Sequence, residues 1–445
     1  QADTSAYGES ECAEESHAPA PSTAAKPKGH GRNPASAFRG AKQIPVSNPE
    51  VSPGEICPEC TRGKLSALKP SPLVHIEGKG ALQASVFQLE RCRCTLCGQS
   101  YTAPLPAGQS SEKYAPSAVS MVALLKYGAG MPFNRIEVMQ ARLEVPLPAS
   151  TQWDLVADAA EELKPVFQEL VHQAAQGEVL HHDDTSMRLI EVPRTEEDTR
   201  TGVFTTGVIS QAPGRSIALF FTGPKHAGEN LGDLLAYRNR ELSAPTLMCD
   251  ALSRNIPRRG NPDQFALGNC LVHGRRNFVK ASEAFPEECR HVIGVFSEIY
   301  YNDRQAKESG LDPKERLRFH QEQSGPLLRE LHKWMNERLA SSATEDNSRL
   351  GKAMKYLIRH WQPLTLFLRK AGAPLDNNIC ERGLKMVVLH RKNALFYRTL
   401  NGSETGDLFM SLIQTCILHK VNPFHYLTQL LTHSDKVQIA RADWL

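Results

Sequence analysis

The sequence contains no long apolar run, because no stretch approaches the roughly 18–20 consecutive apolar residues that a membrane-spanning helix needs. It also has little net charge: 52 Lys and Arg stand against 49 Asp and Glu, which gives a formal charge of +3. Net charge therefore does not indicate a polyanionic partner, and a nucleic-acid surface would have to come from local basic clusters. No signal peptide is visible. These absences predict a cytoplasmic protein with no membrane partner.

Internal repeats are also lacking, and 445 residues are too many for one hydrophobic core. Apolar residues make up 40% of the chain and charged residues 23%, as in ordinary globular proteins. Residues 1–50 are rich in Ala, Pro, Ser and Gly, which predicts a disordered linker. We therefore expect a multidomain protein that begins with this linker and ends in a short tail over residues 433–445.

Cysteine, in contrast, is plentiful: eleven would be many for disulfides in a reducing compartment, so metal binding is considered first. Two CxxC pairs within residues 51–107 can present four thiolates to one structural Zn²⁺. The four predicted zinc ligands are Cys57, Cys60, Cys94 and Cys97. Cys92 is an alternative candidate for one of the four zinc-ligand positions. Reduced structural cysteines remain an alternative, whereas a redox CxxC is disfavoured because neither pair opens a helix in a βαβ unit.

Residues 115–175 show helical periodicity, with two short amphipathic runs followed by a longer one. Ser150 or Thr151 is placed to cap the long helix. Two short helices and a capped helix are compatible with a helix-turn-helix. A small helical linker domain is the alternative.

Residues 178–280 change to strand-like runs separated by Gly and Pro turns: "EVLHHDDTSMRLIEV", "GVFTTGVIS", "RSIALFFTG" and "APTLMCD". "KHAGENLGDLLAYR" between the third and fourth runs indicates a helix. Three strands, a helix and a strand that ends on an acid predict a mixed α/β domain.

Residues 283–370 are helical again, with Trp334 and Trp361 at core positions of the 3.6-residue period. A further helix follows over 376–388, for which Asp376 is the expected N-cap. Another apolar stripe runs from Phe409 to Ile417. Asn422 and Pro423 then start a last short helix.

Three acids stand at points where a catalytic metal site would need them. Asp183 and Asp250 end predicted strands, and Glu381 lies on the helix after Asp376. Phosphoryl transfer on nucleic acids can use two divalent metals held by acids from separate elements, and carboxylates suit Mg²⁺ or Mn²⁺. The pattern alone does not single out these three among 49 acids.

Longer stretches carry a family resemblance: "LHHDDTSMRLIE", "LMCD", "NCLVHGRRNF" and the block from "LDNNICERGLKMVVLHRKNALF" to "HYLTQLL". Together they resemble TnpC-type transposases of the insertion-sequence sixty-six family over roughly residues 25–432. The two CxxC pairs resemble the zinc-binding domain of that family, and "PFNRIEVMQARLEVPLPASTQWDLV" its helix-turn-helix region. The resemblance implies an RNase H-like DDE catalytic domain over 178–432, with a helical insertion at about 283–370.

The resemblance also implies site residues. Its first acid lies in a motif matched by residues 181–185, which selects Asp183, with Asp184 facing the other side of the strand. The second acid commonly precedes Gly-Tyr; here Ala251 and Leu252 follow Asp250. The third falls in "DNNICER", which makes Glu381 the third ligand of a catalytic Mg²⁺ or Mn²⁺ site.

Four basic residues are candidate DNA contacts: Arg275, Arg276, Arg391 and Lys392. Pairing with acids is the alternative for the first two, and a solvated surface for the last two. Cys270 and His273 also raise the possibility of a second metal site, against a buried Cys and a hydrogen-bonded His.

The leading hypothesis is a DNA transposase that binds the terminal inverted repeats, cleaves 3′ ends and joins them to target DNA. It would act as a homo-oligomer on DNA in the nucleoid, possibly with companion proteins of the element. Two alternatives remain: a zinc-dependent DNA-binding regulator without catalysis, and an RNase H-like nuclease without strand transfer.

Overall fold

The structure is a computed structural model that divides the chain into two compact units, Gln1–Lys79 and Gly80–Leu445. It describes residues 45, 52–56, 58, 60–68, 80–93, 100–108, 110–192, 200, 202–257, 264–341 and 343–434. The predicted disordered linker over 1–50 and the tail over 433–445 lie almost entirely outside these residues. Within the first unit, Ile56 and Lys64 form an isolated antiparallel bridge.

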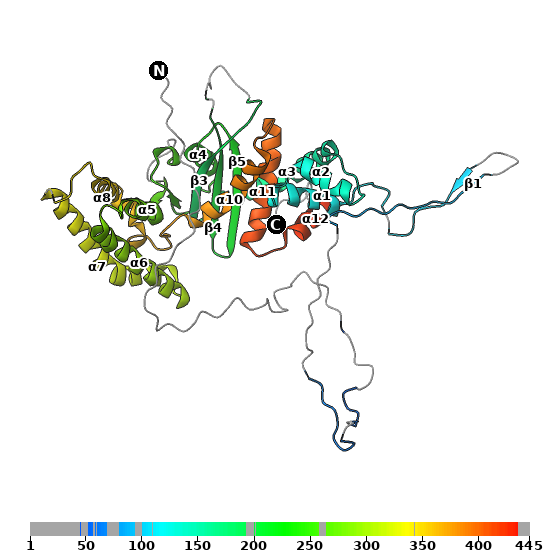
Figure 1. Cartoon of the computed structure of the whole chain (residues 1–445), viewed down its shortest axis with the longest axis horizontal. Helices are drawn as coiled ribbons and strands as arrows, with labels where there is room; N and C mark the ends of the chain where they lie inside the picture. Colours follow the sequence, from blue (N-terminus) through cyan, green and yellow to red (C-terminus); the bar gives the residue numbers. More distant parts are fainter. Residues whose placement is uncertain are drawn as a thin grey trace. The chain divides into compact units, whose positions relative to one another are not determined.

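A five-stranded mixed sheet forms the centre of the second unit (Figure 1). Its strand order is β5-β4-β3-β6-β7. The first three strands pair antiparallel, whereas β6 and β7 continue the sheet in parallel. The strands are β3 (Val179–Met187), β4 (Val203–Ala212), β5 (Arg215–Gly223), β6 (Thr246–Cys249) and β7 (Ala266–Asn269). The predicted mixed α/β order is confirmed, and β7 is an additional strand.

Helices from both halves of the chain pack on this sheet and share its core. They are α1 (Pro116–Ala123), the π-helix η2 (Leu124–Gly128), α2 (Phe133–Arg142), α3 (Ala149–Ala175), α4 (Ala227–Leu235), α10 (Asn378–Ala394), α11 (Leu400–Leu418) and α12 (Pro423–Thr432). α1 and α3 bury apolar side chains in the same cluster as β3, β4 and β5. The predicted helices of 115–175 are present, and their core is continuous with that of the sheet.

A row of side chains on α11 satisfies the outer edge of β5. Asp407, Ser411, Thr415 and His419 recur every four residues, so they lie on one face of the helix. Each accepts a hydrogen bond from an alternate backbone N–H of β5, at Thr222, Phe220, Ala218 and Ser216 respectively. An edge strand left unpaired would expose those N–H groups. The helix thus occupies the place of a sixth strand.

A second hydrophobic core lies between β7 and α10 in the chain and is entirely helical. Its elements are α5 (Leu271–Ala281), α6 (Pro286–Glu308), α7 (Pro313–Ala340), α8 (Arg349–Arg359), α9 (Trp361–Leu364) and the 3₁₀-helix η5 (Leu366–Leu368). Figure 1 shows α5 to α8 grouped at one end of the sheet. This helical module spans Leu271 to Leu375, a wider range than the expected 283–370. Trp334 and Trp361 pack against its core, as predicted.

Several helix boundaries differ from the predictions. α3 begins at Ala149, so Pro148 and not Ser150 or Thr151 holds the N-cap position, and no side chain among the described residues caps this helix start. Ile417 is 51% exposed and does not belong to the buried stripe of α11. Asn422 caps α12 as predicted, accepting from the N–H groups of Phe424 and His425. Among the described residues, helices long and apolar enough to cross a bilayer are absent.

Candidate active site

Asp183 and Asp250 meet at the point where β3 and β6 run side by side. β3 pairs in parallel with β6, and Asp250 directly follows β6. The amide of Asn255 joins the two acids: its Nδ2 donates to Asp250 Oδ1 at 2.5 Å and to Asp183 Oδ1 at 3.3 Å. Asn255 ends the 3₁₀-helix η3 (Ser253–Asn255). The structure therefore brings together two of the predicted acids, although Asp183 lies in the middle of β3 and not at the end of a strand as expected.

Burial and like charge act together on the Asp183 carboxyl group. Burial first, and then the nearby carboxylate of Asp250, raise the pKa of Asp183 to about 7. Hydrogen bonds from Asn255 and from the backbone N–H of Asp184 offset only part of this rise. In the charged state, two carboxylates thus share a partly buried space with one neutral amide between them.

This donor set fits a hard divalent cation. Carboxylate oxygens are the ligands that Mg²⁺ and Mn²⁺ prefer, and a cation would offset the repulsion that raises the pKa of Asp183. Asn255 takes only the Oδ1 atom of each acid. Among the described residues, the Oδ2 atoms have no hydrogen bond and are available for another ligand. No pattern in the sequence indicates Asn255, because its role depends on a loop that folds back to the two strands.

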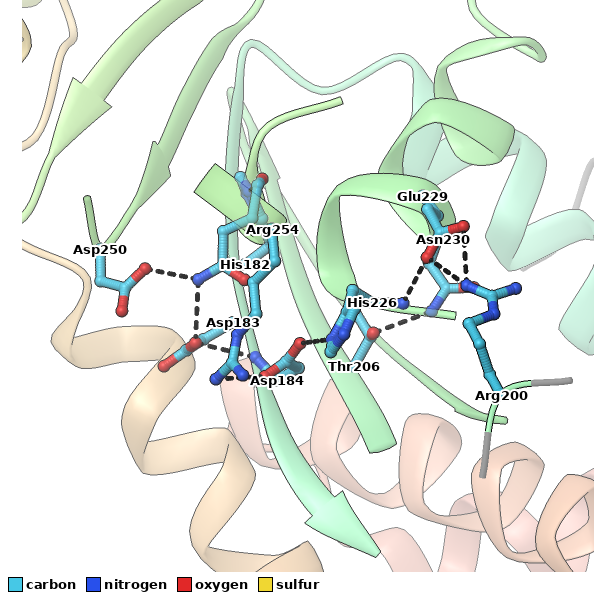
Figure 2. Close-up of polar contacts among 11 residues, drawn as sticks. His182, Asp183, Asp184, Arg200, Thr206, His226, Glu229, Asn230, Asp250 and Arg254 are labelled. Carbon is cyan, nitrogen blue, oxygen red and sulfur yellow. Dashed lines mark hydrogen bonds and ion pairs between the residues drawn. The ribbon is translucent and has the colours of Figure 1, made fainter. Parts of the chain in front are cut away.

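Asp184 lies on the opposite face of β3 from Asp183, as strand alternation predicts. Its side chain is 1% exposed and pairs with Arg254 at 3.2 Å and with His226 Nδ1 at 2.9 Å. Figure 2 shows this group beside the hydrogen bond between Thr206 and Asn230 of α4. Asp184 is therefore a buried, paired residue that fixes α4 and η3 to β3. Arg254 therefore has an internal ion-pair partner.

The start of α10 is tied to β3 through Asn377. Its Oδ1 contacts His181 Nδ1 at 3.2 Å, and its Nδ2 donates to the backbone oxygen of His182. Asn377, rather than Asp376, holds the N-cap position, although Asp376 still accepts from the N–H of Asn378. These contacts therefore hold the first turn of α10 against β3, the strand that carries Asp183.

Close packing continues along α10. Gly207 on β4 is the register partner of Asp183, and a Cβ there would lie 2.9 Å from Leu384 Cδ2. The absence of a side chain at Gly207 lets α10 approach the sheet this closely. Cys380 Sγ donates to the Gly207 oxygen at the same contact.

Glu381 lies in the first turn of α10, next to Cys270 and His273. One ligand atom from each of these three residues lies within 4.8 Å of the others. In the part of the chain that the structure describes, Glu381 has neither a hydrogen bond nor an ion pair with Asp183 or Asp250. The first two predicted acids therefore meet directly, whereas the third has different neighbours.

The four predicted DNA-contacting residues differ in their surroundings. Arg275 and Arg276 are exposed on α5. Lys392 is exposed near the end of α10. Arg391 is half-buried and donates to Thr185 Oγ1 and Ser186 Oγ at the end of β3. Arg391 thus joins α10 to the strand of Asp183.

Three of the four predicted zinc ligands, Cys57, Cys94 and Cys97, lie outside the described residues. Cys60 is described and exposed, and its Sγ accepts from the N–H of Gly63 at 3.5 Å. Around the second pair, β1 (Arg91–Arg93) and β2 (Ser100–Thr102) form an antiparallel hairpin. The zinc site stays a prediction from spacing.

Comparison with known proteins identifies relatives of this chain by sequence. Uncharacterised protein y4hP of Sinorhizobium fredii is 25% identical over 360 residues, which cover 77% of this chain and 63% of the relative. Uncharacterised protein y4qI of the same organism is 23% identical over 325 residues, covering 71% and 58%. The chain thus spans less than two thirds of the length of these curated relatives.

A family model supplies the assignment. The model described as Transposase IS66 family matches residues 112–405, a range that runs from just before α1 into α11 and includes Asp183, Asp250 and Glu381. Because this match covers well over half of the chain, the protein belongs to the IS66 family of transposases.

Proposed function

We propose that the protein is a DNA transposase that cleaves the 3′ ends of its element and joins them to target DNA. The observation that carries the proposal is the pair formed by Asp183 and Asp250 through Asn255, within the range matched by the transposase family. The strand order of the sheet, with three antiparallel strands extended by two parallel ones, is consistent with an RNase H-like fold.

Asp183, Asp250 and Glu381 form the proposed DDE triad. Mg²⁺ or Mn²⁺, when bound, would activate the attacking water or 3′-hydroxyl and stabilise the leaving oxygen. Asp183 in β3 and Asp250 after β6 supply negative charge from adjacent strands, and Asn255 holds their Oδ1 atoms in place. Asn377 fixes the start of α10 on β3 and so sets the position of Glu381 relative to Asp183.

The proposed DNA surface consists of exposed cations near these elements. Arg275, Arg276 and Lys392 are exposed, have no ion pair among the described residues and would neutralise phosphates. Arg391 would position α10 through its contact with β3 in addition to contacting DNA. Recognition of the element ends is assigned to the α1–α3 region as a helix-turn-helix and to a zinc ribbon. The zinc ligands would be Cys57, Cys60, Cys94 and Cys97. Assembly as a homo-oligomer on DNA, with companion proteins, belongs to the same proposal.

The test is a cleavage and strand-transfer assay with DNA carrying the terminal repeats and Mg²⁺. We expect Glu381→Gln, Asp183→Asn and Asp250→Asn each to lose at least ~10³-fold in rate while keeping DNA-end binding. Their losses should not add, because the three acids act as one unit. Glu298→Gln, at an exposed position of α6, is the matched control and should remain active.

The outcomes separate the alternatives. Near-normal strand transfer by Glu381→Gln would remove Glu381 from the triad. Cleavage without joining in the unmodified protein would indicate a nuclease. DNA binding without any cleavage would indicate a regulator. Asp184→Asn should reduce activity less than Asp183→Asn, because Asp184 faces away from the two acids and pairs with Arg254 and His226.

A further inference from the structure

Two buried polar atoms, one on His273 and one on Glu381, lie near each other without a hydrogen bond. His273 Nδ1 and Glu381 Oε1 lie 3.8 Å apart, which is too far for a hydrogen bond. Both atoms are shielded from solvent, and neither has a hydrogen-bond partner among the described residues. Leaving a buried donor or acceptor without a hydrogen-bond partner is energetically unfavourable. Such a pair is therefore expected to hold a ligand between its members.

Cys270 completes the group. Its side chain is fully buried, and its Sγ, His273 Nδ1 or Nε2 and a Glu381 oxygen all lie within 4.8 Å of one another. In a tetrahedral zinc site with bonds of about 2.0–2.3 Å, neighbouring ligand atoms are separated by about 3.3–3.8 Å. The 3.8 Å between His273 Nδ1 and Glu381 Oε1 is a few tenths of an ångström longer than the about 3.3–3.5 Å expected for one nitrogen and one oxygen ligand.

Local structure explains why these three side chains converge. Cys270 is the N-cap of α5, and His273 lies in its first turn, so a three-residue spacing directs both to one side. Glu381 lies in the first turn of α10, whose N-cap Asn377 donates its backbone N–H to Cys270 Sγ at 3.3 Å. Two helix N-termini therefore meet at this group, and their partial positive charge favours a thiolate and a carboxylate.

The thiol itself is protonated in the absence of a metal. Burial raises the pKa of Cys270 to about 11, although backbone N–H groups of Asn377, His273 and Val272 oppose the rise. A bound metal ion would displace this proton, as is usual for cysteine ligands.

We propose that Cys270, His273 and Glu381 form a binding site for a transition-metal ion of the zinc class, separate from the acids Asp183 and Asp250. A thiolate, an imidazole and a carboxylate are ligands for Zn²⁺ or Co²⁺, whereas Mg²⁺ requires oxygen ligands. Three protein ligands leave one coordination position for water or another oxygen ligand. The site does not depend on a catalytic role of Glu381, although Glu381 would belong to both sites.

The test is Co²⁺ binding to the full-length, reduced and metal-stripped chain without DNA. Optical titration reports the number of bound ions and the thiolate-to-Co²⁺ absorption. We expect Cys270→Ser and His273→Ala each to bind one Co²⁺ fewer than the unmodified chain. The predicted ribbon cysteines are unchanged in all these proteins, so their contribution cancels in the comparison.

Cys380→Ser is the matched control, because Cys380 is a buried thiol next to Glu381 that contacts Gly207 instead. It should keep the full number of Co²⁺ ions. Identical titrations for the unmodified chain and Cys270→Ser would overturn the proposal, and the three side chains would then form only an ion pair beside a thiol. If Cys270→Ser does not fold by circular dichroism, His273→Ala, at a partly exposed position, decides in the same way. A loss with Glu381→Gln but with neither other variant would also overturn it.

Because the readout is metal binding without DNA, its outcome is independent of the strand-transfer assay. An inactive triad would leave the expected Co²⁺ difference unchanged. Conversely, absence of this difference would leave the roles proposed for Asp183 and Asp250 intact.

Discussion

Asp183 in the sheet and Asp303 in the helical module are both largely removed from water, but their surroundings are opposite. Asp303 is 5% exposed and contacts Arg316 at 2.6 Å, Lys307 at 2.7 Å and His320 at 3.2 Å. These partners outweigh its burial and hold the pKa of Asp303 well below its usual range. Asp183 has an amide and a second acid beside it, and its pKa is raised to about 7.

The difference separates a carboxylate that stabilises the fold from one that, in the proposed function, binds a ligand. Inside the helical module, negative charge is compensated by basic side chains of α6 and α7, which joins these two helices. Asp183 and Asp250, in contrast, have no ion pair with a basic side chain among the described residues. A buried charge without a partner is costly, and functional sites are where proteins commonly tolerate that cost.

The largest effect on stability is expected from Asp303→Asn. Removal of one partner of a buried ion pair leaves Arg316 without its counter-charge, which should cost about 3–5 kcal/mol of unfolding free energy. Trp334 and Trp361 both pack in the helical module, so tryptophan fluorescence during denaturation with urea reports the change. Asp346→Asn, which breaks an exposed pair with Lys355, is the control and should cost less than ~1 kcal/mol.

The pH dependence of this loss sharpens the comparison. The pKa of Asp303 is lowered in the folded state, so its contribution is fully present above its unfolded pKa and is lost only in acid. The difference between Asp303→Asn and the unmodified protein should therefore stay constant from pH 5 to 8. A difference that rises steadily over this range would contradict the assignment of Asp303 as a permanently charged residue.

Asp183→Asn should change the free energy of unfolding in the opposite direction to Asp303→Asn, and by a smaller amount. The folded pKa of about 7 exceeds the ordinary value of 3.8, so the folded state binds more protons between these values. Stability of the metal-free protein should thus fall as pH rises through this window. The Asn variant lacks this loss and should be more stable at pH 8 by roughly 2–4 kcal/mol. Denaturation in EDTA at pH 4 and pH 8 measures the difference.

Addition of Mg²⁺ provides the control for this result. A ligand at ten times its Kd stabilises the folded protein by about 1.4 kcal/mol. We expect this gain in the unmodified protein and in Asp303→Asn, but not in Asp183→Asn. Equal stabilisation of all three by Mg²⁺ would contradict a metal site at Asp183.

The smallest effect is expected from Lys392→Ala. This side chain is exposed and has no internal partner in the described residues, so it should contribute about one phosphate contact. Its loss should reduce the slope of log affinity against log salt by about 0.9 and leave stability unchanged. Lys333→Ala, on α7 beside Glu337, should leave the slope unaltered. An unchanged slope in Lys392→Ala would make Lys392 an ordinary solvated residue.

Periodicity in the sequence predicted the elements of the sheet well, and its failures have local causes. β3, β4, β5, α4 and β6 were all predicted, because alternation and Gly or Pro turns mark them clearly. β7 was missed because Gly268 and Asn269 disfavour strands, and only its pairing with β6 makes it one. Ile417 was wrongly predicted to be buried, because helical spacing does not show which edge of a wide apolar stripe is covered by neighbouring elements.

The site was predictable only where single residues carry the signal. Asp250 directly follows β6, and the parallel pairing of β3 with β6 brings it next to Asp183, which lies in the middle of β3. Asn255 and the buried pairing of Asp184 with Arg254 depend on a loop that returns across the sheet, which no local pattern records. The approach of Glu381 to Cys270 and His273 similarly requires two helix starts, far apart in the chain, to meet at Asn377.

The row of side chains from α11 along β5 limits how copies of the chain can associate. Strand addition requires a free row of backbone donors, and on β5 alternate N–H groups from Ser216 to Thr222 are already bound by α11. A second copy can therefore not extend the sheet at this edge while α11 stays in place. These hydrogen bonds should also reduce aggregation, because detachment of α11 from β5 would expose a long and apolar edge strand. A multimer on DNA, as proposed, would therefore not form by strand addition at β5, and each copy would keep its own five-stranded sheet.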